Sequence, residues 1–152
     1  PPPPPPTRAF LLVRAAGELL ALRCEQVSGV LLSQHVAAAP GGDRSFLGFV
    51  EAHHRYHPVW SLAGLLGRNP ARLGQANWLV LTAAESGEVC AFVCDAVEQM
   101  IFVTPSEIVA PSRVGEPALA RTADGLAPIV EAPALHAEIL KRKASKQPKH
   151  TP

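Results

Sequence analysis

The sequence has no long apolar run and none of the local motifs that identify the common enzyme classes. No uninterrupted apolar run reaches the roughly 18 residues that a transmembrane helix requires, and no segment resembles a secretory signal. A Walker loop, a Gly-x-Gly-x-x-Gly pattern and a Gly-x-Ser-x-Gly elbow are also missing. We therefore expect no membrane span, no nucleotide site and no serine-hydrolase site.

Cysteine is scarce, with only Cys24, Cys90 and Cys94 in the chain. Cys90 and Cys94 lie in an apolar run that reads as a strand, which places them about 13 Å apart, too far for a disulfide. A single Cys-x₃-Cys pair without further ligands is weak evidence for zinc. We interpret the thiols as small buried apolar groups in a reducing compartment, and we expect neither a metal nor a cofactor.

Charged residues make up only 18% of the chain, whereas hydrophobic residues make up 47%, enough for a folded core. The net charge of +1 conceals a split between the two parts of the sequence. Residues 9–140 carry eight Lys or Arg against thirteen Asp or Glu, and residues 141–152 carry five Lys or Arg and no acid. An acidic folded part is a poor binder of phosphate backbones, so we expect no nucleic-acid partner and a basic disordered tail over residues 142–152. The alternative is a nucleic-acid contact through residues 141–149.

Proline is concentrated at one end, since six of the sixteen prolines are residues 1–6. We interpret residues 1–8 as a Pro-rich linker or tag remnant, so that the chain is expected to be a piece cut within such a linker.

Short apolar runs separated by turn residues follow one another from residue 10 onward. They predict strands at residues 10–14, 19–23, 26–32, 46–52, 56–62, 78–82, 89–94, 96–103, 119–121 and 126–130. Residues 33–44 are expected to form a loop, and residues 133–144 the one convincing helix. About ten short strands and a terminal helix predict an all-β fold of small barrels.

Three polar features are candidates for chemistry. His53, His54 and His57 suggest either a polar hairpin tip or, as the rival, a small metal-binding or enzymatic site. Asp95 interrupts an apolar stretch, as a strand-end cap or a partner contact would. Trp60 and Trp78 are most simply core residues.

The order of several short motifs resembles one known family. Residues 10–13 followed by a Gly-containing turn look like an opening hairpin of that family. Further matches are residues 26–30, Gly48 ten residues before Pro58, and residues 58–62, 93–97, 104–111 and 126–130. These motifs, over residues 9–141, are similar to the CheW-like domain of bacterial chemotaxis coupling proteins.

The resemblance implies two intertwined five-stranded SH3-like barrels with a C-terminal helix. It also implies a non-catalytic adaptor in two-component signalling that binds a CheA-type histidine kinase regulatory domain and the cytoplasmic tip of a methyl-accepting chemoreceptor. Such proteins lie in the cytoplasm at receptor arrays beneath the inner membrane. By position, the implied partner-binding residues are Val27, Val30, Gly48, His53, Pro58, Val93, Asp95 and Val97.

Some positions differ from the family pattern. Residues 51–54, Glu-Ala-His-His, stand where the family has Asn-Leu-Arg-Gly, and Ser61 stands where it has Asp. Two functional alternatives follow from the resemblance: a coupling protein, or the array-docking domain of a larger polar-localisation protein of the ParP kind.

Overall fold

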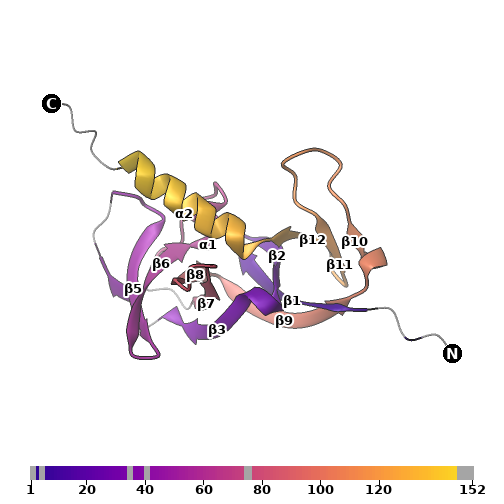
Figure 1. The fold of residues 1–152 in the computed structure, drawn as a ribbon, viewed down its shortest axis with the longest axis horizontal. Coiled ribbons are helices and arrows are strands. Elements are labelled where there is room, and N and C mark those ends of the chain that lie inside the picture. The colour runs from indigo at the N-terminus through magenta and orange to yellow at the C-terminus, as the bar shows by residue number, and fades with distance from the viewer. Residues whose placement is uncertain (1–2, 4–5, 34–35, 40–41, 74–76, 147–152) are drawn as a thin grey trace.

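Strands dominate the protein and form two six-stranded sheets (Figure 1). The computed structural model describes residues 3, 6–33, 36–39, 42–73 and 77–146. Sheet 1 has the order β10-β11-β12-β2-β1-β9 and sheet 2 the order β3-β7-β8-β6-β5-β4. The strands of sheet 1 are β1 (Arg8–Ala15), β2 (Glu18–Arg23), β9 (Ala96–Val103), β10 (Ile108–Val109), β11 (Leu119–Thr122) and β12 (Gly125–Val130). Those of sheet 2 are β3 (Val27–Leu32), β4 (Ala37–Ala38), β5 (Phe46–Ala52), β6 (Arg55–Ser61), β7 (Trp78–Ala83) and β8 (Val89–Cys94).

The helical elements are short except for the last one. They are the 3₁₀ turns η1 (Cys24–Gln26) and η3 (Pro105–Glu107), the single turn α1 (Leu62–Leu65) and the helix α2 (Ala132–Lys146). The mainly β fold with a C-terminal helix is confirmed. Each sheet has five strands of four or more residues and one of two residues, counted over the described segments. One of the two-residue strands, β4, lies within residues 33–44, for which the sequence predicts only a loop.

The strands of sheet 1 come from two separate parts of the sequence, and those of sheet 2 come from one continuous part between them. After β2 it crosses to sheet 2, completes β3 to β8 there, and returns to sheet 1 with β9 to β12. β9 pairs antiparallel with β1, and β12 pairs parallel with β2, so the first and last strands of the chain share one sheet. The two sheets are therefore interleaved along the sequence, although they lie side by side in space (Figure 1).

Alternating side chains divide the apolar residues among three clusters. Cys90, Phe92 and Cys94 of β8 face a core shared by both sheets, whereas Ala91 and Val93 face the interior of sheet 2. Because β8 is buried on both faces, its sequence is a continuous apolar run. The shared core comprises Val13, Ala15, Leu20, Leu22, Trp60, Leu62, Ala63, Leu65, Val80, Cys90, Phe92, Cys94, Val130, Leu135 and Ile139.

The interpretation of the cysteines as buried apolar groups is confirmed for two of the three. Cys90 and Cys94 are buried, Cys24 is half-buried, and all three are free thiols. Burial raises the pKa of Cys90 to about 11 and that of Cys94 to about 12, helped by the nearby carboxylates of Glu88 and Asp95. Such thiols are almost entirely protonated near neutral pH and are poor nucleophiles.

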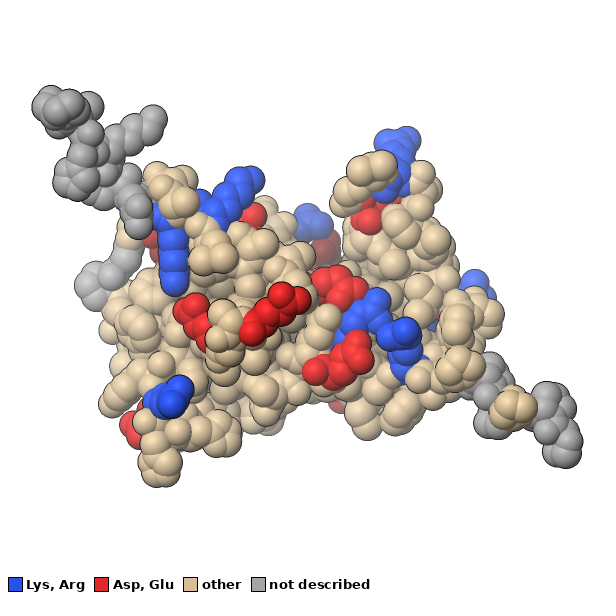
Figure 2. Space-filling model, in the orientation of Figure 1, with Lys and Arg blue, Asp and Glu red and all other residues tan. Residues whose placement is uncertain are grey.

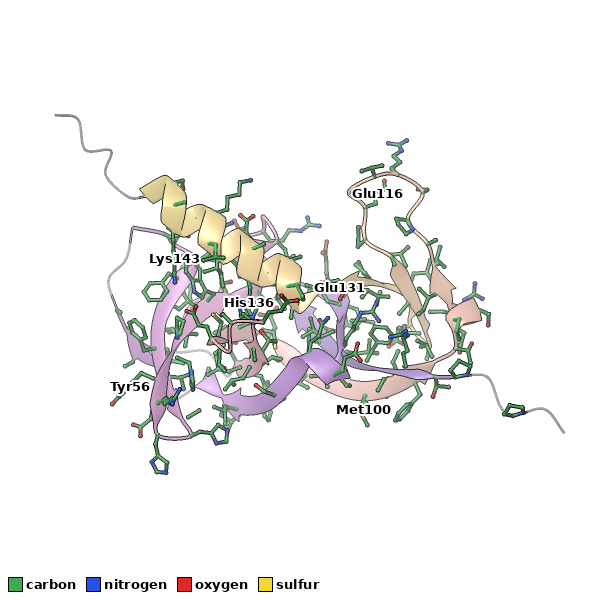
Figure 3. The ribbon with its side chains drawn as sticks, in the orientation of Figure 1. Tyr56, Met100, Glu116, Glu131, His136 and Lys143 are labelled. Carbon is green, nitrogen blue, oxygen red and sulfur yellow. The ribbon has the colours of Figure 1, made fainter. Side chains whose placement is uncertain are left out.

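The start of α2 is fastened to the segment that joins the two sheets. The Glu131 carboxylate accepts hydrogen bonds from Arg23 Nε at 2.8 and 3.0 Å and from Gln26 Nε2 at 3.0 Å. The Gln26 side-chain oxygen in turn accepts from the backbone N–H of Ala132 at 2.8 Å, a free donor at the helix N-terminus. This network lies beside the shared core, where Figure 3 labels Glu131.

The end of α2 is fastened to sheet 2 through Arg142. Its guanidinium donates to Asp43 Oδ1 at 3.2 Å, Ser45 Oγ at 3.0 Å and the Gly64 carbonyl at 3.0 Å, and it pairs with Glu138 one turn earlier at 3.0 Å. These contacts correct the prediction of a disordered tail from residue 142, because the helix continues to Lys146. Residues 147–152 lie outside the described residues. No helix in the described part is long and apolar enough to cross a membrane.

His136 occupies the buried face of α2. Its Nε2 lies 2.8 Å from Thr82 Oγ1, and its ring packs edge-on against Phe92 with 5.9 Å between the centroids. Burial lowers the pKa of His136, an effect that the Glu88 carboxylate partly offsets. The folded protein therefore favours the neutral imidazole.

We expect this burial to make stability depend on pH. Below about pH 6.5 the unfolded chain protonates His136 before the folded chain does, so the free energy of unfolding falls as the pH is lowered, by at most about 1.4 kcal/mol per pH unit for one proton. Urea unfolding between about pH 7.5 and 5.5 measures the loss. His136→Gln removes this contribution, and an equally steep loss in that variant would contradict the assignment.

The Arg142 contacts give a second prediction. Arg142→Met should lower the free energy of unfolding by about 2 kcal/mol, because charge-assisted hydrogen bonds to Asp43 and to a backbone carbonyl are lost. The neighbouring exposed Lys143, changed to Met, is the matched control and should be nearly neutral. Equal losses in the two variants, measured by urea unfolding, would show that α2 does not depend on this anchor.

Candidate partner-binding surfaces

Asp95 lies where the chain returns from sheet 2 to sheet 1. Its backbone N–H donates to the Arg14 carbonyl at 2.7 Å, which ties the β8–β9 crossing to β1. The side chain is exposed and makes no hydrogen bond or ion pair with the described residues. The role in holding the sheets together thus belongs to the backbone of Asp95, and its carboxylate faces solvent.

Val27 and Val97 lie at the beginning of the two strands that follow the crossings between the sheets, β2 to β3 and β8 to β9. Both are half-buried and pack against the shared core, Val27 at the start of β3 and Val97 at the start of β9. From there β3 and β9 run toward opposite ends along the same lower side of the molecule in Figure 1. Each strand pairs with one neighbour only, so each leaves an open sheet edge.

Large apolar side chains are exposed on β3 and the adjacent strand β7. Val30 is 38% exposed, Leu32 is 44% exposed and Trp78 is 37% exposed. Leu32 and Trp78 are direct cross-strand partners, and we call these three residues the β3 patch. The prediction that Trp78 is a core residue is wrong, because β7 begins at this residue beside an edge strand; Trp60 is buried as predicted.

A second apolar pair is exposed on β9. Met100 is 54% exposed and Phe102 is 61% exposed, and Met100 points away from the ribbon in Figure 3. These two residues, the β9 patch, alternate with the inward-facing Ile101 and Val103. A strand with large apolar residues on both faces at a sheet edge is typical of a surface that another molecule covers.

Gly48, Pro58 and Val93 contribute to the shape and packing of sheet 2. Gly48 has a φ of +144°, and a Cβ there would lie 2.1 Å from the Ala37 carbonyl oxygen of β4. Pro58 is half-buried opposite Phe49, and Val93 is fully buried inside sheet 2. The structure therefore corrects the assignment of Val93 as a partner-binding side chain.

His53 and His54 form the tip of the β5–β6 hairpin, as one of the two sequence interpretations predicts. Both are exposed, with φ angles of 53° and 64°. His57 is buried instead, and its Nε2 lies 3.1 Å from the Ala52 carbonyl, to which it donates. The three histidines therefore do not converge, and no three His, Cys, Asp or Glu side chains within the described segments are placed to hold a metal.

A long loop, residues 110–118, projects from the far end of sheet 1 between β10 and β11 (Figure 1). Its Val114 side chain is fully exposed. Acidic and basic side chains are interspersed on the face shown in Figure 2, and some of them touch near its centre. Apolar side chains are thus exposed on the edge strands β3 and β9 and on the loop at the end of sheet 1. The face shown in Figure 2 carries no large surface of one charge.

The comparisons with known proteins agree with this geometry. A family model described as the CheW-like domain matches residues 9–139. The chain belongs to the CheW-like domain family. Among solved structures, the crystal structure of the scaffolding protein TtCheW from Thermoanaerobacter tengcongensis has a TM-score of 0.73 and 19% sequence identity, covering 88% of this chain and 89% of that chain. A search of curated proteins finds no match.

Within the CheW-like fold, the substitution at Ser61 is explained by local structure. Ser61 is the N-cap of α1, and its Oγ accepts from the backbone N–H groups of Gly64 at 3.1 Å and Ala71 at 2.9 Å. An Asp at this position would make the same kind of cap. Ser61 therefore provides this cap without a charge.

The sequence motifs did not indicate Leu32, Met100 and Phe102 as surface residues. A strand of apolar residues does not show which of its faces is covered, because that depends on the neighbouring strands. The alternation in β9 was a usable signal, since Met100 and Phe102 follow Glu98 on one face.

Gly48→Ala should destabilise the domain by more than about 2 kcal/mol, because the new Cβ would overlap the Ala37 carbonyl and the backbone conformation disfavours any side chain. Gly29→Ala is the matched control, since a Cβ at Gly29 meets nothing within 4 Å. Thermal unfolding of both variants measures the difference. A Gly48 variant as stable as the control would show that β4 moves aside at little cost.

Proposed function

We propose that the domain is a non-catalytic adaptor that couples methyl-accepting chemoreceptors to a CheA-type histidine kinase in chemotaxis-type, two-component signalling. It would act in the cytoplasm, at receptor arrays beneath the inner membrane. The main supporting observation is the exposure of large apolar side chains on the two edge strands β3 and β9. Surfaces of this kind on a folded domain usually contact other proteins.

The two patches are suited to a rod-like apolar partner such as the receptor tip. The strands that carry the β3 patch and the β9 patch run along the same lower side of the ribbon in Figure 1, and each begins with a valine, Val27 or Val97, that packs against the shared core. The ends of the two sheets remain for the kinase regulatory domain, which in this family has the same fold. Contacts of this type bury roughly 1,000 Å² or less.

The titratable groups also favour a scaffold over an enzyme. Thr82 and His136 form the one buried hydroxyl–imidazole pair among the described residues, at 2.8 Å. Both are nearly inaccessible, Thr82 beneath α2 and His136 on the buried face of α2, so the pair is better explained as a satisfied buried polar contact. The buried thiols have raised pKa values, which makes them unsuitable as nucleophiles.

A second candidate is the array-docking domain of a larger polar-localisation protein of the ParP kind. The changed hairpin tip, with Glu51 to His54 in place of Asn-Leu-Arg-Gly, favours this possibility because it alters an exposed contact without altering the fold. Co-purification of the native full-length protein distinguishes the two. A complex with both kinase and receptor supports the coupling role, whereas a receptor complex without kinase supports the docking role.

Val30→Glu tests the adaptor function directly. A charge in the β3 patch should weaken binding to the receptor tip or to the kinase regulatory domain of the same genome by about tenfold or more, because the carboxylate loses its hydration in the complex. Ala83→Glu, which puts the same charge at the opposite end of β7, is the control and should bind normally. Isothermal titration calorimetry measures the affinity, and thermal unfolding verifies the fold. Unchanged binding of both partners by Val30→Glu would refute the assignment of this surface.

A further inference from the structure

The one methionine of the chain lies on a surface that the proposed adaptor function uses. Met100 is 54% exposed, although methionine is a residue type that is often fully buried. It lies between Glu98 and Phe102 on the outward face of the edge strand β9, and its side chain points away from the ribbon (Figure 3). Its cross-strand partner on β1 is Leu11, which packs against the shared core. The side chain is therefore open to small solutes and also belongs to an apolar patch.

The three other sulfur atoms of the protein are better protected. Cys90 and Cys94 are buried, and burial raises the pKa values of their thiols to about 11 and about 12. Cys24 is half-buried, and burial raises the pKa of its thiol as well. Peroxides oxidise the thiolate form of cysteine, so these protonated thiols react slowly near neutral pH. A thioether has no proton to lose, so its oxidation depends mainly on exposure. The sulfur of Met100 is therefore the one that a peroxide should reach first.

Oxidation of Met100 by a peroxide is a balanced step. The thioether sulfur attacks a peroxide oxygen, the oxygen–oxygen bond breaks, and the sulfur–oxygen bond of a sulfoxide forms. With hydrogen peroxide the other product is water, so sulfur is oxidised and the peroxide is reduced, with no net gain or loss of protons. Methionine sulfoxide reductases reverse the change, because a dithiol is oxidised to a disulfide while the sulfoxide oxygen leaves as water.

A sulfoxide at Met100 is unsuited to an apolar contact. It adds a hydrogen-bond acceptor to the β9 patch, whereas the side chains of Leu11 and Phe102 offer no donor, and Arg14 on the neighbouring strand is paired with Glu98. A partner that covers the oxidised patch would remove water from the sulfoxide oxygen without replacing its hydrogen bonds, which weakens binding. Since Met100 is exposed in the free domain, the oxidised domain stays folded.

We propose that Met100 is a site of reversible oxidation by peroxides, and that its sulfoxide weakens the binding of the receptor tip to the β9 patch. This inference rests on the proposed adaptor function, to which it adds regulation by oxidants.

The first experiment locates the oxidation. The domain is treated briefly with hydrogen peroxide and then unfolded, its free thiols are alkylated, and its peptides are analysed by mass spectrometry. We expect one added oxygen atom on the peptide that contains Met100, with Cys24, Cys90 and Cys94 all alkylated. Oxidation of the cysteines ahead of Met100, or a Met100 that stays unoxidised, would overturn the proposal.

The second experiment measures the effect on binding. Isothermal titration calorimetry compares the affinity of the untreated and the oxidised domain for a soluble fragment of the chemoreceptor cytoplasmic tip from the same genome. We expect the affinity to fall by about fivefold or more on oxidation, and to recover after treatment with methionine sulfoxide reductases and dithiothreitol. Thermal unfolding of both forms verifies that the fold is kept.

Three variants assign the effect to one sulfur atom. Met100→Leu removes the thioether, so its affinity should be the same with and without peroxide. Met100→Gln places a polar group in the patch and should bind weakly without any peroxide. Cys24→Ser is the matched control and should keep the full sensitivity to peroxide. Sensitivity that is lost in Cys24→Ser or retained in Met100→Leu would overturn the assignment.

The binding experiment also separates this inference from the function on which it rests. Binding that peroxide does not alter would overturn the regulation by Met100 and leave the adaptor function intact. An untreated domain that binds no receptor fragment would overturn the adaptor function, and the regulation with it.

Discussion

The structure depends on the core that the two sheets share. Neither sheet can bury this core by itself. Val13 and Leu22 of sheet 1 and Val80 and Phe92 of sheet 2 belong to one buried cluster together with residues of α2. Removing either sheet would expose this whole cluster to water, at a cost of roughly 25 cal/mol for each Å² of apolar surface. The relative placement of the sheets is therefore set by a packed interior, and the surfaces on β3 and β9 keep a constant geometry.

The helix α2 completes that core and fastens both of its sides. Glu131 joins its first turn to Arg23 and Gln26, in the link between the sheets, and Arg142 joins its last turns to Asp43 and Gly64 of sheet 2. Leu135 and Ile139 fill the space between these anchors. A helix held at both ends keeps the two sheets in a fixed position relative to each other.

Sequence patterns predicted the strands and the helix well, because alternation and turn residues are local signals. The hairpins around Gly17 and Asp124 and the buried run from Val89 to Cys94 needed no long-range information. The exposure of Trp78 and the burial of Val93 were not predictable in this way, since each depends on which strand lies alongside. The helix over residues 133–144 was predicted to within two residues, whereas the order at Arg142 was missed in the prediction of the tail, because its contact with Asp43 comes from a residue nearly one hundred positions earlier.

The path of the chain also constrains how the domain can be made. The N-terminal hairpin β1–β2 pairs with β9 and β12, which are synthesised only after residues 24–95, the stretch that contains all the strands of sheet 2. Phe10, Leu12 and Ala21 pack in one cluster with residues of β9, β11 and β12. During translation these apolar side chains therefore remain uncovered until the last strands have been synthesised. A nascent chain of this topology has a long interval of exposure, and a truncation anywhere before residue 130 leaves the first hairpin without a complete sheet.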